Sequence, residues 1–133
     1  MVRGTRVRLA GIDAPELRQH CRDGRGREYA CGAAAKAALE RRLAGGSVAC
    51  LIASRDRYRR ALAICAALGP DAVPWELNTW LVERGWASVY GRHARRYRQA
   101  EARARAGRYG IWANPSAYEA PESWRKRQGR KRA

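Results

Sequence analysis

The chain has 133 residues, of which 46% are hydrophobic and 30% are charged. This composition is typical of one soluble folded domain, and it excludes a disordered polymer or two full-sized domains. No apolar run approaches the roughly 20 residues that cross a bilayer as a helix, so we expect no membrane span. The first six residues lack the apolar stretch of a secretion signal. We therefore expect a cytoplasmic protein, or a secreted or periplasmic one if the true start lies upstream.

The formal net charge is +16, which predicts an anionic partner: nucleic acid first, an acidic membrane surface second. Arginine codons of a GC-rich genome explain the excess equally well. A phosphate polymer responds to the positive field whatever its origin. Part of the charge lies in a basic tail, and the rest of the chain remains strongly basic without it; the tail charges are Arg125, Lys126, Arg127, Arg130, Lys131 and Arg132.

The chain begins with a predicted strand and a tight turn. Residues 6–12 alternate polar and apolar side chains, which is the pattern of a half-buried strand. The turn at residues 13–16 follows, where Pro15 fixes its own φ angle and keeps the preceding residue extended. Residues 17–28 are polar and contain glycine, so they predict a loop.

A helix and a hairpin come next. Residues 29–43 are rich in alanine and predict a helix that ends before Gly45. Residues 47–53 and 60–68 are apolar runs rich in Val, Ile, Leu and Cys, and each predicts a strand. The charged turn at residues 54–59 joins them into a hairpin.

Two further helices and a tail complete the chain. Residues 74–84 predict the second helix, residues 87–90 a short strand, and residues 95–108 a third, very basic helix. From residue 114 onward the chain is polar, contains proline and then becomes basic, so we expect little fixed structure. The predicted organisation is one domain over residues 1–113 and a flexible basic tail over residues 114–133.

Four cysteines allow three complete pairings. Cys21 and Cys31 bracket a loop, while Cys50 and Cys65 fall on neighbouring predicted strands, which favours these two pairs as disulfides. Four free thiols in a cytosolic protein are the alternative. A zinc site that combines the cysteines with His20 is a weaker idea, because the spacing matches no familiar zinc pattern.

A first cluster of candidate site residues surrounds the early turn. Arg8 and Asp13 lie at the two ends of a strand segment, and Glu16 follows a turn that can fold it back toward both. Such a carboxylate pair can bind a hard cation and orient a water molecule, while the arginine fork suits phosphate oxygens. Judged alone, the cluster is better explained as an ordinary charged surface turn.

A second cluster lies at the hairpin turn, within residues 56–63. A tyrosine and several arginines that lead into an apolar strand can clamp an anion and stack a base. The candidate stacking residues are Tyr58 and Tyr90, and the candidate nucleic-acid contacts beside them are Arg57 and Arg59. An ordinary charged turn is again the simpler interpretation of this cluster alone.

Together and in this order, these motifs resemble the staphylococcal-type thermonuclease family. The similarity covers about residues 4–113 and includes the strand and turn, the start of the first helix, the charged hairpin and the second and third helices. The matching blocks are residues 7–16, 31–35, 56–63, 77–87 and 97–112. The longer loop at residues 19–23 is similar to the bacterial, often exported branch of the family.

The resemblance implies an α+β fold, namely an OB-type β-barrel capped by three helices, and calcium-dependent hydrolysis of phosphodiester bonds in DNA or RNA. By position, Asp13 is the implied Ca²⁺ ligand, and Ala14 offers its backbone carbonyl to the ion. Glu16 is the implied residue that positions or deprotonates the attacking water. Arg8 and Arg60 are the implied grip on the phosphate.

The chain departs from this family pattern in two places. The opening strands and their Asp-Gly-Asp turn, which supply a second calcium-binding aspartate, are absent before Gly4. We expect an N-terminally truncated barrel or a wrongly assigned start, weaker calcium binding, and self-association through the exposed sheet edge. Arg59 stands where the family usually has glycine, so it either relaxes a turn that favours positive φ or adds a phosphate contact.

Two functions therefore compete. The first is a metal-dependent nuclease acting on DNA or RNA. The second is a nucleic-acid-binding module on the same fold with little or no catalytic activity, because the first calcium-binding aspartate is missing. OB-type barrels often bind single strands without cutting them.

Overall fold

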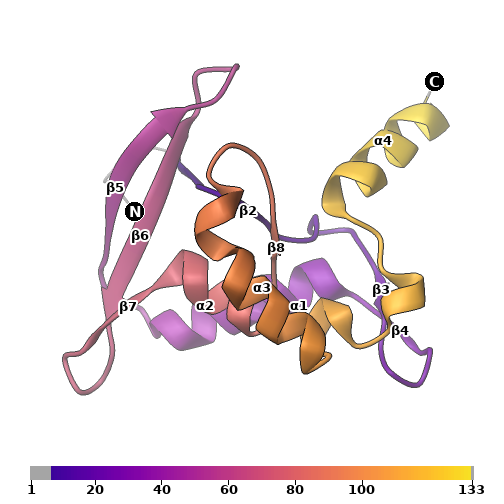
Figure 1. Ribbon diagram of the computed structural model, residues 1–133, viewed down its shortest axis with the longest axis horizontal. Helices are drawn as coiled ribbons and strands as arrows, with labels where there is room; N and C mark the ends of the chain where they lie inside the picture. Colours follow the sequence, from indigo (N-terminus) through magenta and orange to yellow (C-terminus); the bar gives the residue numbers. More distant parts are fainter. Residues whose placement is uncertain (1–6, 133) are drawn as a thin grey trace.

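The computed structural model describes residues 7–132, which form an α+β fold (Figure 1). Its main sheet is built around the antiparallel hairpin of β5 (Val48–Arg55) and β6 (Ala61–Leu68). Strand β1 (Val7–Leu9) pairs in parallel with the start of β6, and β7 (Pro74–Glu76) pairs antiparallel with its end. The predicted α+β class and hairpin are confirmed. The turn expected at Gly4 lies outside the described residues.

Two further sheets are only two strands wide. Strand β2 (Ile12–Asp13) pairs with β8 (Ser88–Val89), and β3 (Cys21–Arg22) pairs with β4 (Glu28–Tyr29). Among residues 7–132 the strands thus form three separate sheets. These sheets do not establish closure into an OB-type barrel, which stays a prediction.

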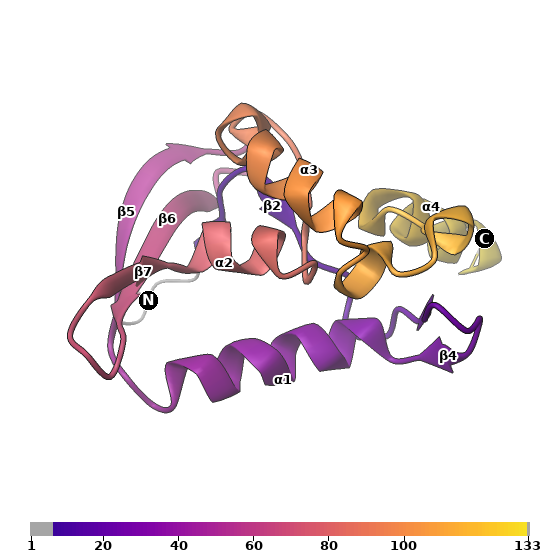
Figure 2. The ribbon, with the colours of Figure 1, turned by 60° about the horizontal axis from the view of Figure 1, so that its bottom comes forward.

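Helices pack beside the main sheet and extend away from it. Figure 2 shows α1 (Cys31–Leu43) running lengthwise past α2 (Leu77–Glu83) and α3 (Arg98–Ala106). Helix α4 (Pro121–Arg132) lies at the opposite end of the molecule from the β5–β6 hairpin (Figure 1). Short 3₁₀ turns are η1 (Ala94–Tyr97), η2 (Gly110–Trp112) and η3 (Pro115–Ala117). No described helix is long and apolar enough to span a membrane.

The core lies between the sheet and the helices. In β6 every second residue is buried, from Ala61 to Ala67, as the two-residue period of a strand requires. Small side chains on this face let α2 approach closely enough for Asn78 to bond the sheet. The Asn78 side chain is fully buried and donates to the carbonyl oxygens of Ala10 (3.0 Å) and Ala63 (3.1 Å). These bonds fix the end of β1 to β6 and α2.

The main differences from the predicted boundaries concern three segments. The loop expected at residues 17–28 contains strand β3 and leads into β4. The helix expected at residues 74–84 begins only at Leu77, because residues 74–76 pair with β6 as β7. The Glu76 side chain caps this helix by accepting from the Thr79 backbone N–H at 3.2 Å. The third predicted helix is divided into η1 and α3.

The expectation of little fixed structure after residue 114 also differs from the structure. Residues 121–132 form α4, with Pro121 at its first position and Glu122 in its first turn, both of which favour a helix start. The Arg127 guanidinium donates to both carboxylate oxygens of Glu119, at 2.9 and 3.0 Å. Side-chain contacts of this kind were not visible from the polar composition of the segment.

Both predicted disulfides are confirmed. Cys21 bonds Cys31, and Cys50 bonds Cys65, so that no described cysteine is free. Cys50 and Cys65 are direct cross-strand partners in the β5–β6 hairpin. The Cys21–Cys31 bond ties β3 to the first turn of α1. Each bond closes a loop that the unfolded chain would otherwise leave open, which favours the folded state.

The tip of the β5–β6 hairpin uses a left-handed backbone conformation at Arg59, where φ is +65°. The Asp56 carboxylate stabilises the turn by accepting from the backbone N–H groups of Tyr58 (2.8 Å) and Arg60 (2.9 Å). A side chain with a Cβ atom is strained in this conformation, whereas glycine is not. The turn therefore requires positive φ at this position, and Arg59 adopts it in spite of the strain.

Replacing Arg59 by glycine should stabilise the protein by about 1 kcal/mol, because the backbone strain disappears. Thermal unfolding followed by circular dichroism measures the effect as a midpoint higher by a few degrees. Arg59→Ala is the matched control, since it removes the same charge but keeps the Cβ atom. Equal shifts in both variants would assign the effect to charge and contradict the strain.

Candidate functional site

The site begins at the reversal between β1 and β2, which depends on Gly11. Its φ is +78°, and a Cβ atom there would lie 2.5 Å from the His93 carbonyl oxygen and 2.8 Å from the Tyr97 ring. Only glycine fits both the conformation and the space. The reversal brings the side chains of Arg8 and Asp13 to the same side, with Nη2 of Arg8 3.9 Å from Oδ1 of Asp13.

A residue from the far end of the chain completes this cluster. Arg125 in α4 donates from Nη2 to Oδ2 of Asp13 at 3.0 Å and from Nη1 to Oδ1 at 3.4 Å. The same Nη1 donates to Oε1 of Glu16 at 2.7 Å. One guanidinium thus bridges two carboxylates, in the forked geometry that makes arginine–carboxylate pairs strong.

Burial dominates the electrostatics of Asp13, whose side chain is 6% exposed. Loss of hydration raises the pKa of Asp13 above its ordinary value, and the hydrogen bonds from Arg125 and the charge of Arg8 offset this only in part. Because the folded pKa lies above the unfolded one, the stability that Asp13 contributes is lost as the pH rises through the folded value. Burial disfavours the charged form of Arg125, but its bonds to Asp13 and Glu16 outweigh this and raise the pKa of the guanidinium.

Next to this cluster lies a basic cleft of about 430 Å³. Its walls come from β1, from the β5–β6 turn, from the segment after β8 and from α4. Two acidic side chains, Asp56 and Glu122, also line it. The positive side chains are more numerous; they are Arg8, Arg57, Arg60, Arg92, Arg125 and Lys126. The cleft is therefore suited to an anion.

Arg60 and the tyrosines are held at the rim of this cleft. Nε of Arg60 donates to Oδ2 of Asp56 at 2.6 Å, and its guanidinium lies 5.3 Å from the Tyr58 ring centroid. The side chains of Tyr58 and Tyr90 are 68% and 41% exposed, so their rings are accessible to a partner. The guanidinium of Arg125 lies 6.0 Å from the Tyr90 ring.

The structure brings most, but not all, of the predicted site residues together. Arg8 and Arg60 line the basic cleft, as do the predicted nucleic-acid contacts Arg57, Tyr58 and Tyr90. Asp13 adjoins the cleft through its contacts with two of the lining arginines, and Ala14 follows it at the end of β2. Arg59 is not among the residues that line the cleft.

Glu16 lines a different cleft, of about 670 Å³, between the β3–β4 hairpin and α4. Arg125 lines both clefts and stands between them. The predicted residues therefore do not share one pocket: Arg8 and Arg60 face one side of Arg125, and Glu16 faces the other.

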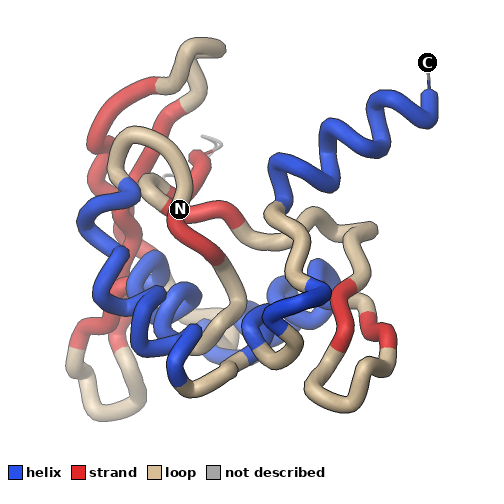
Figure 3. Tube along the Cα trace, turned by 45° about the vertical axis from the view of Figure 1, so that its right-hand side comes forward, coloured by secondary structure: helices blue, strands red, loops and turns tan. Residues whose placement is uncertain are grey.

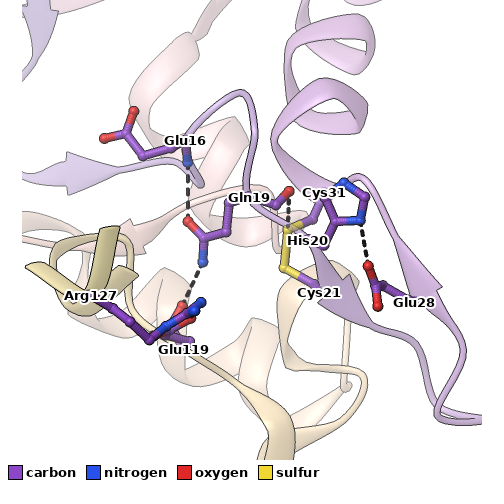
Figure 4. The surroundings of a disulfide bond; sticks show 8 residues. All are labelled: Glu16, Gln19, His20, Cys21, Glu28, Cys31, Glu119 and Arg127. Carbon is purple, nitrogen blue, oxygen red and sulfur yellow. Dashed lines mark hydrogen bonds and ion pairs between the residues drawn. A yellow bond between two sulfur atoms is a disulfide. The ribbon is translucent and has the colours of Figure 1, made fainter. Parts of the chain in front are cut away.

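Sequence reasoning missed Arg125 and Gln19. Gln19 is 1% exposed; its Nε2 donates to the Glu119 carbonyl oxygen at 2.9 Å, and its Oε1 accepts from the Glu16 backbone N–H at 3.2 Å. Figure 4 shows it between the Glu16 turn and the segment that precedes α4, beside the Cys21–Cys31 disulfide. Both missed residues act across about 100 positions of sequence, where no local pattern could point to them.

The carboxylates of the site are also the kind of group that binds a divalent metal ion. Hard oxygen ligands suit calcium, and the two carboxylates of Asp13 and Glu16 supply them in kind. Both are already bonded to Arg125. Within residues 7–132, no group of three or more His, Cys, Asp or Glu side chains is arranged to hold a metal ion. As folded, the two carboxylates match calcium in the kind of ligand, but Arg125 occupies the oxygens that an ion would need.

The fold and the site together define an α+β domain with an arginine-lined anion cleft beside a carboxylate pair. The sequence profile of the family described as "Staphylococcal nuclease homologue" matches residues 6–114. The chain belongs to this family, as the resemblance in its motifs predicted.

The chain is also similar to several individual proteins. The chain is 38% identical over 114 residues to the succinoglycan biosynthesis protein ExoI of Rhizobium meliloti (strain 1021), an alignment covering 84% of this chain and 57% of that protein. It is 33% identical over 135 residues to the probable endonuclease LCL3 of Schizophyllum commune, covering 91% and 44%. It is 33% identical over 137 residues to protein ParB of Escherichia coli, covering 96% and 70%. The chain spans about half the length of the first two proteins.

Replacing Gln19 by leucine should destabilise the protein by about 2 kcal/mol, because it removes the side-chain partner of two part-buried backbone groups. A lower midpoint in urea unfolding measures this loss. Gln99→Leu, at an exposed position of α3, is the control for the same chemical change. If both variants unfold at the wild-type urea concentration, Gln19 does not connect the Glu16 turn to the C-terminal segment.

Proposed function

We propose that this chain is a nuclease that hydrolyses phosphodiester bonds of DNA or RNA. The observation that carries the proposal is the position of Arg8 and Arg60 in one cleft, with a carboxylate pair beside it. Relatives named as endonucleases support it, among them the protein of Schizophyllum commune and an uncharacterized endonuclease of Haemophilus influenzae, to which the chain is 30% identical.

The two arginines bind the phosphate group. Their side chains are 42% and 49% exposed, so each can turn its donors toward a ligand in the cleft. A planar guanidinium donates two parallel hydrogen bonds to phosphate oxygens. Negative charge grows on these oxygens as a nucleophile adds to phosphorus, and fixed donors stabilise that charge.

Glu16 acts on the attacking water in this proposal. Its carboxylate accepts a proton from the water while the oxygen forms a bond to phosphorus. The bond from phosphorus to the leaving ribose or deoxyribose oxygen breaks, that oxygen takes a proton from solvent water, and Glu16 returns its proton to the solvent. The products are a phosphate monoester and a free sugar hydroxyl. In the present arrangement Arg125 donates to Glu16 at 2.7 Å, so Glu16 becomes an effective base only when this bond opens.

The rest of the cleft would hold the chain on either side of the reacting phosphate. Tyr58 and Tyr90 offer exposed rings on which bases stack, and Arg57 lies beside the first of them. Arg59, at the hairpin tip and outside the cleft, would add positive charge to the approach. These contacts are independent of base identity, so the proposal does not favour one sequence or one sugar.

Calcium dependence is part of the proposal, with Asp13 and the backbone carbonyl of Ala14 as the groups for the ion. Because Arg125 bonds the carboxylates, no step is assigned to the ion here. The same bond favours a second candidate, a nucleic-acid-binding module that does not cut, since a carboxylate held by a guanidinium is a poor base.

Digestion of single-stranded DNA with Ca²⁺ or with a chelator distinguishes the two candidates. Wild-type protein should cut only with Ca²⁺, and Glu16→Gln should bind DNA but not cut it. Arg8→Gln and Arg60→Gln should each lower the cleavage rate by about 100- to 1,000-fold, as expected for a lost transition-state donor. Arg98→Gln removes an exposed charge of α3 and should have only a small effect. Tight binding without cutting by the wild type would support the binding module instead.

A further inference from the structure

Helix α4 holds the Asp13–Glu16 carboxylate pair, and it does so with a single side chain from the C-terminal part of the chain. We infer that α4 is an internal competitor of the divalent cation: Arg125 keeps the cation out while α4 is docked, and cation binding releases α4. The inference rests on the proposed function, because it concerns the cation that the nuclease reaction needs.

Geometry makes the two states exclusive. Arg125 donates to both oxygens of Asp13 and to one of Glu16, at 2.7 to 3.4 Å. A calcium ion binds carboxylate oxygens at roughly 2.3–2.6 Å, so an ion on these oxygens would take the place of the guanidinium. Nη2 of Arg8 also lies 3.9 Å from Oδ1 of Asp13. A doubly charged ion between two guanidinium groups would be strongly repelled.

The burial of Asp13 explains why the competitor is an arginine. A carboxylate that is 6% exposed is costly to leave unpaired, because its hydration is lost. Without a bound cation, a positive side chain must neutralise it. Arg125 does this from a separate helix, so the site exchanges one positive partner for another instead of exposing a bare charge.

The attachment of α4 to the rest of the molecule includes several charged contacts. Apart from Arg125, its described side-chain anchors include Arg127 on Glu119 and the buried ring of Pro121. Lys126, Arg127 and Arg130 are exposed. Figure 3 shows α4 extending outward from the body of the molecule. Ion pairs that a competing charge can replace thus contribute to the attachment of α4, beside the buried Pro121 and the partly buried Trp124.

Arg125 also lines the basic cleft with Arg8 and Arg60. A phosphate group in that cleft gives Arg125 a second anion to bind when a cation takes the carboxylates. Cation and nucleic acid should therefore bind cooperatively. The cation frees Arg125 for the phosphate, and the phosphate, by binding Arg125, frees the carboxylates for the cation.

Calcium binding to the full chain, measured by isothermal titration calorimetry at neutral pH, tests the inference. Arg125→Gln should bind Ca²⁺ about tenfold more tightly than wild type or better. Arg130→Gln removes the same charge from an exposed position of the same helix and should change the affinity less than about threefold. Equal or weaker Ca²⁺ binding by Arg125→Gln would overturn the inference.

Glu119→Gln separates competition from simple charge. This variant loosens α4 by removing the partner of Arg127 and also makes the protein more positive. General electrostatics predicts weaker Ca²⁺ binding, whereas competition by α4 predicts tighter binding. The variant also leaves the carboxylate pair and Arg125 intact, so it remains informative if Arg125→Gln fails to fold.

Hydrogen exchange of the α4 amides in the wild type provides a readout that does not depend on activity. Saturating Ca²⁺ should speed exchange in residues 122–130 and leave α1 unchanged. Ca²⁺ binding with unchanged α4 exchange, or no Ca²⁺ binding by any variant, would overturn the inference. Release of α4 without DNA cleavage would instead leave the inference standing and refute the proposed nuclease. Calcium-dependent cleavage without release of α4 would refute the inference and support the proposed nuclease.

Discussion

A negative charge that is removed from water needs a positive partner, and in this protein the charge belongs to Asp13. The Gly11 reversal directs this carboxylate inward, beside Arg8, and the fold resolves the cost of burial by bringing Arg125 from α4. That pairing docks Arg125 of α4 against the carboxylates. The same guanidinium belongs to a residue that lines both the arginine-lined cleft and the cleft that contains Glu16.

The ion pair joins two parts of the molecule that are attached differently: the Glu16 turn, which is firmly fixed, and α4, which has charged contacts. The Cys21–Cys31 bond and the buried Gln19 fix the Glu16 turn against α1 and the segment before α4 (Figure 4). Helix α4 itself is attached in part through charges. A firm carboxylate pair with an exchangeable cationic partner is consistent with a protein that binds a metal ion only in one of its states.

Local sequence patterns predicted much of the fold and part of the candidate site. Two-residue alternation located the β5–β6 hairpin, and the strand neighbours within it predicted the Cys50–Cys65 bond. The ordered motifs around Arg8, Asp13 and Arg60 identified the family. Periodicity did not separate β7 from α2, because the cap at Glu76 and the pairing with β6 set that boundary. The contact of Arg125 with Asp13 spans 112 positions of sequence. The polar, basic composition of the C-terminal segment does not predict where that segment packs.

Arg8 and Arg60 are proposed to hold one phosphodiester next to the carboxylates. A crystal structure of the Glu16→Gln variant with a short single-stranded DNA and Ca²⁺ is the decisive measurement. We expect one phosphate group within hydrogen-bond distance of both guanidinium groups, with a base against Tyr58 or Tyr90. DNA bound on another face of the molecule, with the arginine cleft free of phosphate, would contradict it.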